Sequence, residues 1–211
     1  MDDTALANRH LTLRPWRPWR PEDVDAMCEA VHESCDSLGR WLPWCHPGYG
    51  PADARQRIDA CLAGWRSGEL FSFAVCDTRG GRLLGSAGLS QHNRMHRCAN
   101  AGYWIRRSAQ RQGLAAAALA AVARFGFEQL GLIRVEVVVE AANVASQRTA
   151  ERAGARFEAL ARNKLRVRGE PRDARVYALV PGDLADRAAT DTVATVQATA
   201  GPVTTDPREP G

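Results

Sequence analysis

The chain has 211 residues, of which 45% are hydrophobic and 25% are charged, a balance typical of soluble globular proteins. No apolar run approaches the roughly 20 residues of a membrane-spanning helix, and the acidic first residues lack the apolar region of a secretory signal, so we expect a cytoplasmic protein without membrane contact. The net charge of +4 combines +7 over residues 1–182 with −3 over residues 183–211, and without a basic run interleaved with aromatics it suits a polyanionic cofactor better than nucleic acid.

The first predicted elements are one strand and two helices. Alternating apolar residues over 11–16 predict a strand, and Pro21 followed by acidic residues predicts the start of a helix. A second helix is expected over 51–67. Between the two helices, residues 39–51 form an aromatic loop that contains Pro, Gly and the side chains of Trp41, Trp44, His46 and Tyr49.

The middle of the chain changes to an extended pattern. Residues 70–75 and 82–90 predict a hairpin, because the turn Asp-Thr-Arg-Gly-Gly lies between them. A third strand over 98–105 precedes an alanine-rich helix over 114–130. The hexapeptide Gln-Arg-Gln-Gly-Leu-Ala at 110–115 connects that strand to that helix.

This connection is a candidate anion site. The first N–H groups of a helix have no partner within the helix, and its dipole places partial positive charge at that end. Gly113 permits a close approach of a ligand to the backbone, and Arg111 adds a cation suited to phosphate. An ordinary strand-to-helix turn with solvated arginines is the alternative, because the hexapeptide matches neither the P-loop nor the dinucleotide fingerprint.

The second half predicts a buried strand over 133–139, a helix from Asn143 to Gly154, and strands over 156–167 and 174–180. Antiparallel runs mixed with strand–helix–strand units indicate an α+β fold with helices on both faces of a sheet. We expect one domain over residues 1–182 and a disordered tail over 183–211, which is rich in Ala, Thr, Asp, Pro and Gly.

The six cysteines contain no Cys-x-x-Cys pair. Their scatter favours reduced, packed thiols, and no spacing of Cys and His indicates a metal site.

Several segments of the chain form a recognisable set. The central one is Gln110-x-x-Gly113-x-Ala115 after the fourth strand. The others are Leu13-Arg-Pro-Trp, Leu38-Gly-Arg-Trp-Leu-Pro-Trp44, Gly102-Tyr-Trp104, Asn143-x-x-Ser146 and Gly169-Glu-Pro-Arg-Asp173-x-x-x-Tyr177. Together they resemble the GCN5-related N-acetyltransferase (GNAT) superfamily and its RimJ/RimL-like branch, which acetylates protein N-termini. Their agreement favours a functional turn at 110–115.

The resemblance implies a mixed, mostly antiparallel sheet of six to seven strands in which the fourth and fifth strands splay apart. It implies that acetyl-CoA is the acetyl donor, with its pantetheine arm in the gap and its pyrophosphate on the turn. The cofactor-binding residues implied are Tyr103, Trp104, Ile105, Gln110, Arg111, Gln112, Gly113, Leu114, Ala115, Asn143 and Ser146.

The catalytic residues are less clearly marked. Ser146 resembles the family's hydroxyl near the cofactor sulfur and is the candidate general acid, although a serine in a first helical turn also bonds within its own helix. The family's glutamate on the fourth strand is replaced by Asn100, which cannot accept a proton. Glu158 is the candidate substitute, and the alternatives are Glu136, Glu140 and water relayed through His92 or His96.

The expected activity is acetyl transfer to a primary amine, chiefly the α-amine of a protein or peptide N-terminus, as in acetylation of ribosomal proteins. An α-amine with a pKa of about 7.7–8.0 needs less help from a base than lysine does. Small amines such as polyamines, amino acids or aminoglycosides, and a non-catalytic CoA-binding module, are the alternatives. The aromatic loop is assigned to substrate binding through Trp41, Trp44, His46 and Tyr49, against a purely packing role; a monomer or a homodimer is expected.

Overall fold

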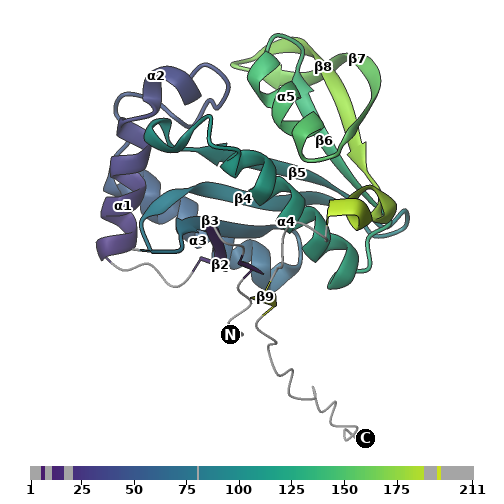
Figure 1. The fold of residues 1–211 in the computed structure, drawn as a ribbon. Helices are drawn as coiled ribbons and strands as arrows, with labels where there is room; N and C mark the ends of the chain where they lie inside the picture. The colour runs from purple at the N-terminus through teal and green to yellow at the C-terminus, as the bar shows by residue number, and fades with distance from the viewer. Residues whose placement is uncertain (1–5, 8–10, 17–20, 80, 188–193, 196–211) are drawn as a thin grey trace, which may run out of the picture.

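A single mixed sheet organises the computed structural model, which describes residues 6–7, 11–16, 21–79, 81–187 and 194–195 (Figure 1). The strand order is β7-β8-β6-β5-β4-β3-β2-β1-β9, and β5 with β6 is the parallel pair among otherwise antiparallel neighbours in the described chain. The strands are β1 (Leu6–Ala7), β2 (Leu11–Pro15), β3 (Phe71–Asp77), β4 (Leu83–Asn93), β5 (Cys98–Ile105), β6 (Arg134–Glu140), β7 (Arg156–Val167), β8 (Glu170–Leu179) and β9 (Ala194–Thr195).

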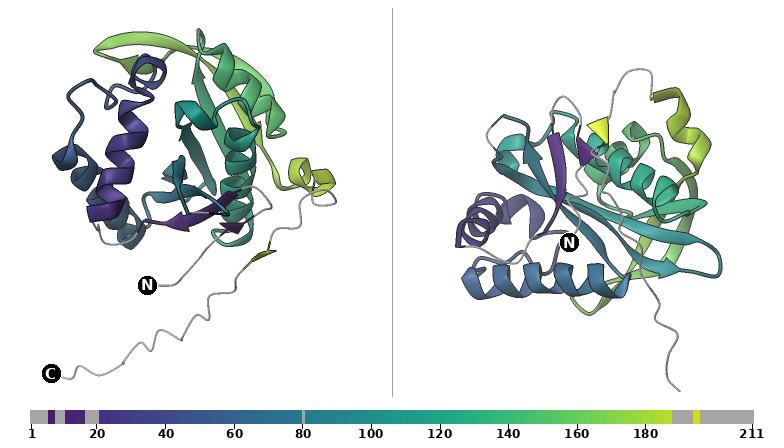
Figure 2. Two further views of the ribbon diagram at one scale, coloured as in Figure 1. Left: turned by 60° about the vertical axis from the view of Figure 1, so that its left-hand side comes forward. Right: turned by 90° about the horizontal axis from the view of Figure 1, so that it is seen from below.

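Helices cover both faces of this sheet, as the sequence predicts (Figure 2). They are α1 (Pro21–His32), α2 (Cys35–Leu38), α3 (Pro51–Ser67), α4 (Leu114–Glu128) and α5 (Val144–Arg152), with the 3₁₀ turns η1 (Arg107–Ala109) and η2 (Pro181–Arg187). Local signals set their ends. At the start of α3 the Gly50 amide donates to Asp53 Oδ2 at 2.8 Å, and Gly68 ends that helix in the left-handed conformation.

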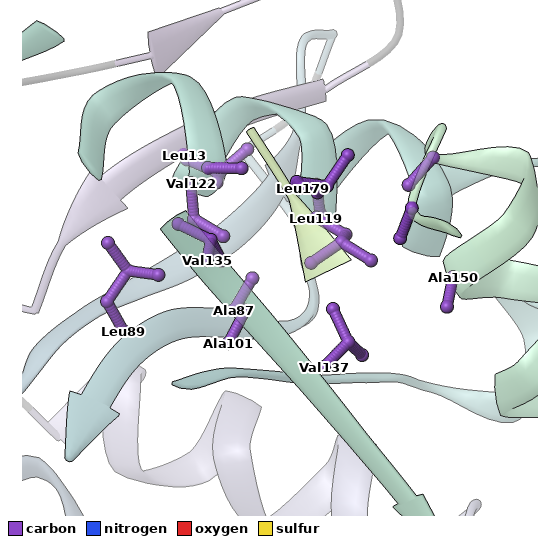
Figure 3. Packing of buried hydrophobic residues seen from close by; sticks show 14 of the residues in the cluster. Leu13, Ala87, Leu89, Ala101, Leu119, Val122, Val135, Val137, Ala150 and Leu179 are labelled. Carbon is purple, nitrogen blue, oxygen red and sulfur yellow. The ribbon is translucent and has the colours of Figure 1, made fainter. Parts of the chain in front are cut away.

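Two hydrophobic cores lie on opposite faces of the sheet. One packs α4 and α5 against the strands and includes Leu119, Val122 and Val137 (Figure 3). The other packs α1 and α3 against the opposite face, with residues such as Met27 and Ile58. Strands β3, β4 and β5 contribute side chains to both cores, so this part of the sheet is buried on both faces.

The parallel pairing of β5 with β6 ends after three residue pairs. Cys98, Ala99 and Asn100 face Arg134, Val135 and Glu136, and beyond them each strand is paired only on its outer side, β5 with β4 and β6 with β8. Asn100 Oδ1 accepts a hydrogen bond from the Val138 amide at 3.3 Å, at the apex of the gap. The splay expected between the fourth and fifth strands is therefore present, and it lies between β5 and β6 once β1 is counted.

The described structure continues past the boundary predicted at residue 182. Leu184 is buried in the core with α4, and Asp183 accepts a hydrogen bond from the Val180 amide and pairs with Arg156 at 2.8 Å. Residues 183–187 thus belong to η2 rather than to a disordered tail, because one buried leucine and one acid tie them to the domain. The remainder of that predicted tail lies outside the described residues, except for β9. None of the helices described is both long and apolar enough to cross a bilayer.

A buried arginine joins α1 to the end of β5. The Arg106 side chain is only 1% exposed, and its guanidinium donates to Leu83 O at 3.1 Å, to Glu29 at 2.5 Å and to Glu33. Glu33 also accepts hydrogen bonds from the amide and hydroxyl of Ser108, both at 2.8 Å. These bonds lower the pKa of Glu33 to about 2, chiefly through Arg106. The segment that leads to the turn at 110–115 is therefore fastened to α1.

This network generates a prediction about stability and pH. Because the pKa of Glu33 in the folded protein lies below its unfolded value, its contribution is complete above about pH 4.5 and is lost as the pH falls toward 2. We expect Glu33→Gln to lower the free energy of unfolding at pH 7 by about 1 to 2 kcal/mol, a value reduced for solvent screening. Denaturant titrations at pH 7 and pH 3 measure the difference in unfolding free energy between the unmodified protein and the variant. This difference should be smaller at pH 3. Glu22→Gln, an exposed acid in the first turn of α1, is the control, and a loss of stability independent of pH would contradict the assignment.

Candidate functional site

The turn between β5 and α4 presents unpaired amides at a helix N-terminus. Arg111 and Gly113 have φ angles of +61° and +78°, and the first helical bond runs from the Ala117 amide to Gly113 O at 3.0 Å. In the part of the chain that is described, no acceptor bonds the amides of residues 111 to 116. Several N–H groups therefore converge where the helix dipole is positive, an arrangement suited to an anion.

The space in front of this turn is open. A Cβ added at Gly113 would meet no protein atom within 4 Å, so glycine is required here by its left-handed φ and leaves room for a ligand. Arg111 and Gln112 are exposed, whereas Leu114 is buried and offers only its amide. Gln110 Nε2 donates to Ile105 O at 3.0 Å, so this side chain holds the turn against the end of β5.

The gap between β5 and β6 is lined by main-chain groups of alternate residues. The Arg106 amide donates to Leu84 O at 2.7 Å, toward β4. Since alternate residues of a strand direct these groups to opposite sides, Trp104 also bonds toward β4, while Tyr103 and Ile105 face the gap. Of the three residues predicted along the pantetheine arm, two thus offer main-chain groups there. Trp104 instead contributes a buried side chain to the core with α1 and α3.

A pair of hydroxyl groups bridges the gap from β5 to α5. Tyr103 Oη donates to Ser146 O at 3.1 Å, and the two hydroxyl oxygens lie 2.9 Å apart, which leaves the Ser146 hydroxyl as the donor in that second bond. Burial raises the pKa of Tyr103, so its hydroxyl is protonated at neutral pH. Asn143 Oδ1 caps α5 by accepting from the Ser146 amide at 3.1 Å. The cap therefore uses the backbone of Ser146 and leaves its hydroxyl to Tyr103.

The sequence predicts a role for the main chain of Tyr103 but gives no direct sign of a role for its hydroxyl. Its contact with Ser146 joins residues 43 positions apart. The alternation of residues along β5 is the sequence pattern that indicates the direction of this side chain. It places Tyr103 on the same face of the strand as the buried Ala101 and Ile105.

The carboxylates considered as bases differ in their partners and in their position along the gap. Arg134 binds Glu136 at 3.1 Å and both oxygens of Glu158, and this pairing lowers the pKa of Glu158. Both acids are held near the closed end of the gap, where Arg134 faces Cys98, and this argues against Glu158 as the base. Glu140 lies instead at the end of β6 beside the open part of the gap, half-buried and, among described residues, without a side-chain partner.

The two histidines weighed as water relays lie at the other end of β5. Burial lowers the pKa of His92, whose ring packs on Phe71 at 5.2 Å. The His96 amide bonds to Asn93 in the turn before Cys98. This turn is at the closed end of the gap, so neither histidine is placed beside Tyr103 or Ser146.

The aromatic loop divides into packing residues and one open side chain. The Trp44 ring lies 5.8 Å from that of Trp104 and 6.0 Å from that of Tyr49, and Tyr49 is only 3% exposed. These two side chains pack the loop onto the sheet, and the half-buried Trp41 stacks with the Arg40 guanidinium at 4.8 Å. His46 is exposed and lines a cavity.

That cavity has a volume of about 500 Å³ and lies between the loop around α2 and the turn of the β7–β8 hairpin. Arg168 in that turn donates to Gly39 O at 2.6 Å, a contact that joins segments 129 residues apart. The lining residues are Cys35, Asp36, Gly39, Arg40, Pro43, Cys45, His46, Pro47 and Arg168. In the described ranges, no three His, Cys, Asp or Glu side chains are grouped to hold a metal ion.

Comparisons with known proteins give one consistent result. Residues 10–156 match the family model described as an acetyltransferase (GNAT) domain. The chain is 28% identical over 179 residues to a candidate ribosomal N-acetyltransferase, YdaF, of Bacillus subtilis, with 84% of this chain and 94% of that protein covered.

Solved structures agree with that match. A candidate ribosomal-protein-serine acetyltransferase from Vibrio cholerae has a TM-score of 0.75 and 31% identity, with 86% of this chain and 99% of that chain covered. A ribosomal L7/L12 α-N-protein acetyltransferase, RimL, solved in complex with coenzyme A, has a TM-score of 0.70 over 81% of this chain and 94% of its own. At 19% identity, the second likeness concerns the fold alone.

Proposed function

The chain belongs to the GNAT acetyltransferase family and is an N-acetyltransferase, and we propose that it transfers the acetyl group of acetyl-CoA to the N-terminal α-amine of a protein or peptide. The observation that carries this proposal is the gap between β5 and β6 with an amide-lined turn at the start of α4. The gap suits an extended chain that bonds to strand edges, and the turn suits a diphosphate.

The residues present fit coenzyme A as the donor. The unpaired amides of 111–116 and the open space at Gly113 suit the pyrophosphate, and Arg111 adds a cation at the same turn. The main-chain groups of Tyr103 and Ile105 that face the gap suit the amides of the pantetheine arm. Asn143, with Oδ1 engaged in the cap, has its side-chain NH₂ available to the same arm.

Acetyl-CoA would supply a thioester whose carbonyl the amine attacks. Main-chain N–H groups of β5 that face the gap would donate to the carbonyl oxygen as negative charge develops on it. The Tyr103–Ser146 hydroxyl pair would protonate the departing thiolate: Ser146 would turn its O–H from Tyr103 Oη to the sulfur and recover a proton from water, while Tyr103 holds Ser146 in place.

An α-amine is the acceptor that this site can serve best. Its pKa of about 7.7–8.0 leaves much of it unprotonated at pH 7 to 8, so the neutral Asn100 in place of a glutamate is tolerable. Glu140 at the open end of the gap would take the remaining proton, directly or through water. The relatives from V. cholerae and B. subtilis carry names that specify ribosomal proteins as acceptors, which supports a protein acceptor here.

The proposal is tested by supplying acetyl-CoA with peptides that begin with Ser, Ala or Met and, separately, with polyamines, amino acids and aminoglycosides. We expect thiol release and a mass increase of one acetyl group at the peptide α-amine. N-terminally blocked peptides containing lysine should react far more slowly at pH 7.5, because the lysine pKa is near 10.4. Turnover confined to small amines would overturn the peptide assignment.

Gly113→Ala tests the donor site. The substitution places a Cβ in the open space and requires a left-handed φ from alanine, at a cost of about 1 kcal/mol in stability. We expect coenzyme A to bind at least tenfold more weakly by calorimetry. Gly81→Ala is the matched control, because Gly81 has a φ of +67° and equally open space in the β3–β4 turn. Equal CoA affinity in the two variants would refute the assignment.

Ser146→Ala tests the hydroxyl pair. The α5 cap is made by the backbone of Ser146, so we expect stability and CoA affinity to change little while kcat falls by about 10²-fold. Tyr103→Phe should lower kcat less, because Ser146 remains. Ser67→Ala, which removes an exposed hydroxyl at the end of α3, is the control. A Ser146→Ala enzyme with normal kcat would mean that the thiolate leaves without this proton donor.

Matched variants distinguish Glu140 from Glu158 as the base. We expect Glu140→Gln to lower kcat at least tenfold. Glu158→Gln should leave kcat within about twofold, because Arg134 already holds that carboxylate in its charged form. Steady-state rates with one Ser-initiated peptide measure both, and the opposite order would return the role of base to Glu158.

A further inference from the structure

The cavity between α2 and the β7–β8 turn is cationic, and we propose that it binds acidic side chains that follow the acceptor N-terminus, so that the preferred acceptor is an acidic N-terminal segment. Arg40 and Arg168 would contact those carboxylates. This inference rests on the proposed function, because it assigns the cavity to the residues of a peptide acceptor that follow the reacting amine.

The position of the cavity follows from the topology. The end of β5 continues into η1, where the Arg107 amide donates to Ser34 Oγ at 2.9 Å, just before α2. On the other side, β8 pairs with β6 up to Glu140, and the β7–β8 hairpin extends beyond that end. The left view of Figure 2 shows this hairpin arching toward α2. The cavity thus lies over the open end of the gap, where an acceptor would approach.

The charges around the cavity are mainly positive. Arg40 and Arg168 are exposed lining residues, and in the described structure neither has a carboxylate partner. Asp36 is the one acidic lining residue, and it is 95% exposed and lies 4.0 Å from the Arg107 guanidinium. The local field therefore favours an anion and repels polyamines and aminoglycosides.

Both guanidinium groups keep donors for a ligand. Arg168 uses one Nη2 bond to Gly39 O, and Arg40 lies with its carbon over the face of Trp41, so hydrogen-bond donors of each remain unused. A guanidinium held in this way loses less side-chain entropy when a carboxylate binds. Along the same hairpin the exposed cations Arg162, Lys164, Arg166 and Arg172 accompany the exposed acids Glu158, Glu170 and Asp173 and outnumber them.

The test uses peptides that share the first two residues, Ser-Ala, and carry Asp and Glu, Asn and Gln, or Lys and Arg at the next four positions. We expect kcat/KM to fall from acidic to neutral to basic, with at least a tenfold range at low salt. The range should narrow at about 0.5 M salt, where charges are screened beyond a few ångströms. Equal values for the three peptides would overturn this inference and leave the proposed function intact, whereas no acetylation of any peptide would overturn the proposed function itself.

Variants of the chain locate the preference. Arg40→Gln and Arg168→Gln should each reduce the ratio of kcat/KM for the acidic peptide to kcat/KM for the basic peptide severalfold. The double variant Arg40→Glu with Arg168→Glu should reverse the preference, so that the basic peptide reacts faster. Arg168→Lys separates charge from the bond to Gly39, and the preference should persist. Arg66→Gln is the control, because this exposed arginine lies at the far end of α3 from the cavity.

A competition experiment separates an acidic peptide from nucleic acid. Poly-glutamate should inhibit acetylation of the acidic peptide at lower concentrations than a ribo-oligonucleotide of equal charge. The reverse order would assign the cationic surface to nucleic acid and would overturn the proposal, as would an acid preference that survives in the double glutamate variant.

Discussion

The pairing of β5 with β6 ends after Asn100 and Glu136, and the geometry of the site depends on that break. Each strand completes its ladder on the outer side, with β4 or β8, so the fold does not need the inner bonds. The main-chain groups left between them require water or a ligand as partners. The same divergence separates Tyr103 from α5 by a distance that its side chain can span, and it leaves the cavity over the open end.

One ion-pair network ties the turn at residues 110–115 to α1. Arg106 and Glu33 fasten the segment after β5 to α1, and the same segment leads directly into the turn that carries Gly113. The loop that borders the cavity follows α1 in the chain and is packed onto the sheet by Trp44. The position of the turn relative to the loop therefore depends on the half-buried ion pair of Arg106 with Glu33, since the two segments are far apart in the chain.

Local patterns in the sequence were sufficient for most elements and for the turn. The limits of α3 and β5 and the Asn143 cap depend on residues adjacent in the chain, and they agree with prediction. Contacts between distant segments could not be read in this way. The pairing of Glu158 with Arg134 requires knowing that β7 and β6 lie on either side of β8, and the bond from Arg168 to Gly39 depends on the curvature of a hairpin. These contacts decide which of the candidate residues are free to act.

The amide of Asn100 at the apex of the gap has a further consequence. A carboxylate in this position would place a negative charge between the two strands, and it would lose that charge when protonated. Asn100 accepts from the Val138 amide through a neutral oxygen that does not titrate. The side-chain contact at the closed end of the gap between β5 and β6 therefore carries no charge, and Asn100 undergoes no protonation that would change it.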